Sequence, residues 1–185
     1  MQEITAAKLT DLNFWEDLDS DTIKRCKASL PTTPQQFAQW DWIPAINRLW
    51  VLLRAEFLAD GKLHVLACDF ADIAISACKG NDVPKAAARA AVAIKREWLA
   101  GKATYSELKV ADKHILTLRT NGNLTGDSLT TTGGLTTTTT KNALDAADAA
   151  VYHHAESAAW CAADCAYNVD PAAVTKLLGD IANSL

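Results

Sequence analysis

Histidine and cysteine side chains at helical spacing are the first residues of this 185-residue chain that could do chemistry. His154, Cys161 and Cys165 fall at i, i+7 and i+11, roughly one face of a helix. Imidazole and thiolate bind zinc, and Cys68 or Cys78 could supply a fourth ligand. The competing interpretation is packing, because alanine flanks these residues and a thiol packs there as well as a methyl group does. We therefore assign no metal ligand, and we expect Cys68, Cys161 and Cys165 to be buried and to react slowly.

Tryptophan is the second residue type that could form a site. Three of the six tryptophans lie within a stretch of eleven residues, and two others fall on separate predicted helices. Stacking on a nucleotide would require nearby cations, whereas large aromatics also fill the gaps that small residues leave in a core. We favour packing, and we place the neighbouring arginines on a solvated helix face. The residues concerned are Trp40, Trp42, Trp50, Trp98, Trp160, Arg48 and Arg54.

The common catalytic motifs do not occur in the sequence. It contains no P-loop, no dinucleotide-binding GxGxxG, no HExxH, no GxSxG and no paired CxxC. The five cysteines form an odd number, which argues against a disulfide framework. We therefore predict no catalytic residue and no cofactor, and we expect a protein that is not an enzyme.

Charge is distributed unevenly along the second half of the chain. Residues 84–113 hold seven basic side chains and three acidic ones, whereas residues 142–175 hold acidic side chains and no lysine or arginine. One interpretation is that the two segments face each other or are simply solvated. The other is that the acidic segment binds a partner. The candidate partner-binding residues are Asp145, Asp148, Glu156 and Asp164.

The composition favours an all-α fold. Alanine accounts for 34 of the 185 residues, and it is the best helix former while burying little area. The net charge of −4 argues against nucleic acid as the partner. No apolar run approaches the roughly 18 residues that a membrane span needs, and the first residues do not resemble a signal peptide. We therefore expect no membrane partner and a cytoplasmic protein, in the host cytoplasm if a phage encodes it.

Apolar spacing and cap signals predict six to eight helices in a single domain over residues 1–185. Thr33-Pro34 and Thr104 to Glu107 have the pattern of helix starts, and Asp60-Gly61, Gly80 and Gly101 mark helix ends. A single long helix is expected over 142–168 and a last one after Pro171. Residues 117–140 are rich in threonine and glycine. They form an inserted β-hairpin or a flexible loop, and the sequence leaves both open.

Three stretches of the chain resemble alanine-rich helical proteins of phages and bacteria, some of which are labelled putative immunity proteins. They are the tryptophan-rich region through Ala67-Cys68-Asp69-Phe70-Ala71-Asp72, the run Ala93-Ile94-Lys95-Arg96-Glu97-Trp98-Leu99-Ala100-Gly101-Lys102-Ala103-Thr104, and the helix with Ala146-Ala147-Asp148-Ala149-Ala150. The resemblance implies an all-α fold and carries no catalytic residues. The Thr/Gly-rich insert departs from it.

These observations together predict a non-enzymatic protein-binding function. The expected type is an immunity or anti-defence protein that neutralises another protein by binding it, since an acidic protein is steered toward basic surfaces. The alternative is a helical protein that binds a small ligand or a metal at the Trp/Arg or His/Cys clusters. Whether the chain forms a homo-oligomer is left open.

Overall fold

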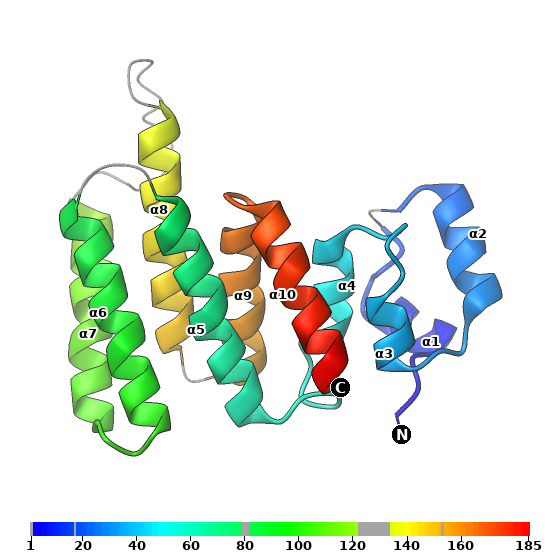
Figure 1. The fold of residues 1–185 in the computed structure, drawn as a ribbon, viewed down its shortest axis with the longest axis horizontal. Coiled ribbons are helices and arrows are strands. Elements are labelled where there is room, and N and C mark those ends of the chain that lie inside the picture. The colour runs from blue at the N-terminus through cyan, green and yellow to red at the C-terminus, as the bar shows by residue number, and fades with distance from the viewer. Residues whose placement is uncertain (1, 17, 79–81, 122–133, 153) are drawn as a thin grey trace.

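Ten α-helices make up the described part of the chain in a computed structural model (Figure 1). The structure describes residues 2–16, 18–78, 82–121, 134–152 and 154–185. Within these ranges no strand occurs, and Ile4 and Thr32 form an isolated β-bridge. The helices are α1 (Ala6–Asp11), α2 (Ser20–Ser29), α3 (Pro34–Ala38), α4 (Ala45–Leu52), α5 (Asp60–Ala77), α6 (Asp82–Leu99), α7 (Tyr105–Asn121), α8 (Gly134–Val151), α9 (Ala155–Tyr167) and α10 (Pro171–Ser184). The predicted all-α class is confirmed.

The helices lie side by side in an elongated row, with α6 and α7 at one end and α1 to α3 at the other (Figure 1). Helix α5 lies inside this row and packs against α6, α8 and α9. Helix α10 contacts α9, α3 and α4, so the end of the chain joins the N-terminal helices to the central ones. None of the helices in the described ranges has the length and apolar character that crossing a bilayer requires.

The predicted helix starts are present. Thr33 and Gln36 form a capping box at the start of α3, in which each side chain bonds to the other residue's backbone N–H. Thr104 and Glu107 do the same before α7. Asp170 caps α10 by accepting from the backbone N–H of Ala173. Side chains thus satisfy backbone donors that each helix leaves free in its first turn.

Two features differ from the sequence prediction. The helix expected over 142–168 is interrupted between Val151 and Ala155, and the described helices number ten instead of six to eight. At this interruption the backbone carbonyl of Tyr152 accepts a hydrogen bond from Lys95 Nζ at 3.0 Å. The ends of the predicted insert, 117–121 and 134–140, are helical. Residues 122–133, where a hairpin was one alternative, lie outside the described residues.

Alanine forms the central helix contacts. Helices α5, α8 and α9 bury alanine against one another. A side chain that ends at Cβ lets two helix axes approach closely, and close packing then replaces bulk as the source of stability. The buried alanines of these helices are Ala67, Ala71, Ala74, Ala143, Ala146, Ala147, Ala150, Ala155, Ala158, Ala159, Ala162, Ala163 and Ala166.

Enlarging one of these alanines tests the close packing. Ala162 in α9 is fully buried, whereas Ala172 in α10 is exposed. We expect Ala162→Leu to lower the free energy of unfolding by about 1–3 kcal/mol through overpacking, and Ala172→Leu to change it little. Chemical denaturation of the two variants and the wild type measures the difference. Equal stabilities for both variants would show that α9 does not pack closely at Ala162.

Candidate functional site

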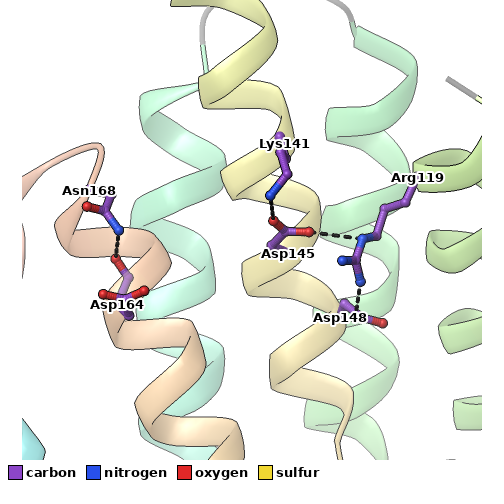
Figure 2. Close-up of polar contacts among 6 residues, drawn as sticks. All are labelled: Arg119, Lys141, Asp145, Asp148, Asp164 and Asn168. Carbon is purple, nitrogen blue, oxygen red and sulfur yellow. Dashed lines mark hydrogen bonds and ion pairs between the residues drawn. The ribbon is translucent and has the colours of Figure 1, made fainter. Parts of the chain in front are cut away.

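The first two candidate partner-binding residues, Asp145 and Asp148, are paired inside the molecule. Arg119 of α7 contacts both, with Arg119 Nε lying 2.9 Å from Asp145 Oδ1 and its Nη1 bonded to Asp148 (Figure 2). Lys141, one turn earlier on α8, lies 2.8 Å from Asp145 Oδ2. These aspartates therefore attach α7 to α8. The expected facing basic segment was 84–113, but the described cations that bind them are at 119 and 141.

Asp148 also faces a second carboxyl group. Burial raises its pKa to about 6, and Asp112 of α7 adds to this through its negative charge and a side-chain hydrogen bond, while Arg119 acts in the opposite direction. Asp145 on the same helix adds a smaller repulsion. The protonated carboxyl is the form that suits this environment, because it can donate to Asp112 without adding charge to the interface.

Glu156 and Asp164 lie on another helix, α9, and on one stripe of it. Glu156, Trp160 and Asp164 follow one another at four-residue steps, so they share a face. Glu156 accepts a hydrogen bond from the backbone N–H of Ala55 and lies 3.8 Å from Arg54, which ties α9 to the segment after α4. Asp164 is exposed, and the backbone carbonyl of Asp164 accepts from the Asn168 amide (Figure 2).

The four candidate carboxylates therefore do not form one patch. Asp145 and Asp148 of α8 are directed at α7, and Glu156 of α9 accepts a hydrogen bond from Ala55 in the N-terminal half of the chain. Asp164 lies apart from Asp145 and Asp148 (Figure 2). In the described part of the chain, no ion pair involves the Asp164 side chain. The prediction that all four bind a partner stays a prediction, and their contacts favour Asp164 for that role.

A cleft of about 580 Å³ opens beside Asp164. Trp50 of α4 and Trp160 of α9 form part of its wall and meet edge to face, with ring centroids 4.6 Å apart. The Trp50 indole N–H donates to the Leu12 carbonyl at 3.0 Å, which fixes the ring against the segment after α1. The lining residues are Leu12, Asn13, Phe14, Glu16, Ile46, Asn47, Trp50, Trp160 and Asp164. Among them Glu16 and Asp164 are the ionisable groups.

The tryptophan cluster is divided between two places. Trp40 and Trp42 stack on each other near α3, with centroids 5.0 Å apart, while Trp50 belongs to the cleft. The expectation that Arg48 and Arg54 are solvated is wrong. Arg48 is buried and donates to the Ala38 carbonyl, and the Arg54 guanidinium lies 4.2 Å from the Trp50 ring centroid.

One lysine is buried, and its burial was not predicted from the sequence. Lys95 of α6 is fully buried; its Nζ donates to the Tyr152 carbonyl and lies 4.4 Å from the Trp98 ring centroid. Burial lowers its pKa to about 8, and burial together with Lys95 lowers the pKa of nearby His64. The signal was available in the sequence, because Lys95 continues at helical spacing the buried series at 88, 91 and 92.

Residues 67–72 and 93–104, two of the stretches on which the resemblance was based, meet where α5 packs against α6. Arg96 of α6 binds Asp69 and Asp72 of α5, at 2.8 and 2.6 Å, beside the buried Cys68 and Lys95. Burial raises the pKa of the Cys68 thiol to about 11, which keeps it protonated and unreactive. These residues hold α5 and α6 together.

The three residues weighed as zinc ligands differ in how exposed they are. His154 and Cys161 are exposed and Cys165 is half-buried, so the prediction of a buried Cys161 is wrong. In the part of the chain that the structure describes, no three His, Cys, Asp or Glu side chains are grouped so that they could hold a metal ion. Comparison of the chain with protein-family models, with curated proteins and with solved structures finds no match.

Stability should depend on pH through Asp148. Its pKa is about 6 in the folded chain against an ordinary 3.8, so its contribution to folding is present below pH ~4 and lost as pH rises through about 6. Asp148→Asn imitates the protonated carboxyl. We expect its melting temperature to match the wild type near pH 4 and to exceed it at pH 7, measured by circular dichroism.

Two further variants control this measurement. Asp112→Asn removes the facing carboxyl group and should move the transition to lower pH, while Asp180→Asn changes an exposed residue of α10 and should leave the profile unaltered. If Asp148→Asn is less stable than the wild type at pH 7 but not at pH 4, the raised pKa assigned to Asp148 is contradicted.

Thiol reactivity should separate one cysteine from the rest. Cys161 is exposed, whereas Cys26, Cys68 and Cys78 are buried and burial raises the pKa of Cys165 to about 12. Partial burial and the nearby Asp164 also raise the pKa of Cys161, so its accessibility is what distinguishes it. We expect a chromogenic disulfide reagent to modify one thiol faster than the other four in the native protein, and Cys161→Ser to remove that rapid phase. Stopped-flow absorbance measures it, with Cys165→Ser as the matched control one turn away. A rapid phase that persists in the 161 variant would contradict the assignment.

Proposed function

We propose that this protein is a non-enzymatic protein-binding protein that neutralises a basic partner protein by occupying its surface. The observation that carries the proposal is the exposed carboxylate pair of Glu16 and Asp164 at a tryptophan-lined cleft. The net charge of −4 gives the field that steers such a partner. The resemblance to proteins labelled putative immunity proteins adds the immunity or anti-defence type, acting in the cytoplasm.

The cleft has the properties of an interaction site. Trp50 and Trp160 are half-buried, so their indole rings present apolar area next to charged groups, and tryptophan contributes strongly to binding energy at protein interfaces. The Trp50 N–H is already bonded within the chain, which holds the wall in place before any partner arrives.

A small-molecule ligand is the second candidate. Its support is the volume of the cleft, about 580 Å³, which lies in the range of ligand pockets in proteins. The exposure of its carboxylates favours a macromolecular partner.

Partner capture with charge-reversed variants tests the proposal. The tagged protein is incubated with lysate of its source organism, and bound proteins are quantified by mass spectrometry. We expect a basic protein to be enriched by the wild type and by Asp180→Lys, an exposed control, and at least fivefold less by Asp164→Lys, because reversal slows association and repels the partner.

The salt dependence of capture is the second readout. Binding to exposed carboxylates should weaken as ionic strength rises, because salt screens exposed charges. Equal enrichment by the Asp164→Lys and Asp180→Lys variants, or capture that is insensitive to salt, would contradict the proposed surface. Circular dichroism melts of both variants establish that they remain folded.

A further inference from the structure

We propose that the cleft between α4, α9 and residues 12–16 receives an arginine side chain of the partner protein. This inference rests on the proposed function and names the chemistry of its central contact. The residues that carry it are the Trp50–Trp160 pair, the carboxylates of Glu16 and Asp164, and the side-chain amides of Asn13 and Asn47.

The charge of the cleft selects a cation. Among the described residues that line it, two carry carboxylates and none is a lysine, arginine or histidine. Arg54, the cation beside Trp50, donates from Nε to the Trp50 carbonyl at 3.1 Å and lies 3.8 Å from Glu156, so its own contacts hold it outside the lining. An anionic ligand would face Glu16 and Asp164 with no compensating charge among the lining groups.

The aromatic wall selects a flat cation. The negative face of an indole ring attracts a guanidinium, which also stacks on it. The chain itself uses this contact twice, since Arg25 lies 4.2 Å from the Trp42 centroid and Arg54 lies 4.2 Å from the Trp50 centroid. Trp160 of the cleft wall is half-buried and offers indole surface to an incoming group.

Hydrogen-bonding capacity favours arginine over lysine. Guanidinium carries five N–H donors in one plane, whereas an ammonium carries three and is more strongly hydrated. Four of the lining residues carry side-chain acceptors: the carboxylates of Glu16 and Asp164 and the amide oxygens of Asn13 and Asn47. A guanidinium has donors for several acceptors at once, and the carboxylates would supply charge-assisted bonds. The volume of about 580 Å³ leaves room for the backbone beside the arginine, as a peptide segment requires.

A titration with matched peptides tests the inference. The ¹⁵N-labelled full chain is titrated with three blocked tripeptides, Gly-Xaa-Gly, whose central residue is arginine, lysine or citrulline. Citrulline has nearly the shape of arginine without its charge. We expect the arginine peptide to shift the indole N–H signals of Trp50 and Trp160, with at least threefold weaker binding of the lysine peptide and at least tenfold weaker binding of citrulline. Trp50→Phe and Trp160→Phe serve only to assign those signals.

Variants of the cleft provide the second arm. Glu16→Gln with Asp164→Asn keeps the size of both side chains and should weaken arginine-peptide binding at least tenfold, whereas Asp180→Asn should leave it unchanged. Equal affinity for arginine and citrulline, shifts that map away from the cleft, or no shift at all would overturn the inference. Tighter binding of choline than of the arginine peptide would identify a small-cation pocket and would also overturn it.

The outcomes of the partner capture and of the peptide titration can be told apart. Partner capture that depends on Asp164 without arginine-peptide binding would leave the proposed function in place and reject arginine as the occupant. Arginine-peptide binding without any Asp164-dependent protein capture would support the chemistry of the cleft and reject the protein-binding function.

Discussion

Contact between alanine-bearing faces of α5, α8 and α9 is the constraint on which the rest of the structure depends. Alanine contributes little apolar area per residue, so these helices gain stability by approaching closely over their length. A lysine or tryptophan in such a contact would separate the axes. Partly exposed arginines join the surrounding helices to this contact: Arg96 joins α6 to α5, and Arg119 joins α7 to α8.

Lys95 shows how the structure treats a charge that is buried. Its ammonium lies where α8 ends and α9 begins, and it bonds to the Tyr152 carbonyl. A backbone carbonyl and the Trp98 ring replace water only partly, which explains why burial lowers its pKa to about 8. The buried lysine thus links α6 to the break between α8 and α9.

The sequence predicts the features that depend on neighbouring residues. Capping at Thr33 and Thr104 and the alanine stripe follow from helical spacing within a single segment. The pairing of Asp145 and Asp148 could not be predicted, because many basic residues were available and only the packing of α7 against α8 selects Arg119. The cleft could not be predicted either, since Trp50 and Trp160 are far apart in sequence and meet only because α4 packs against α9.

The position of the cleft follows from the two faces of α9. One face is committed to α5 and α8 through its alanines, and the opposite stripe carries Glu156, Trp160 and Asp164 one turn apart. Along that stripe the first residue binds the segment after α4, the second contacts Trp50, and the third reaches solvent. A rigid helix thus passes from internal contact to an exposed carboxylate within two turns. Because the alanine face fixes the rotation of α9, it also fixes the direction in which Trp160 and Asp164 face the cleft.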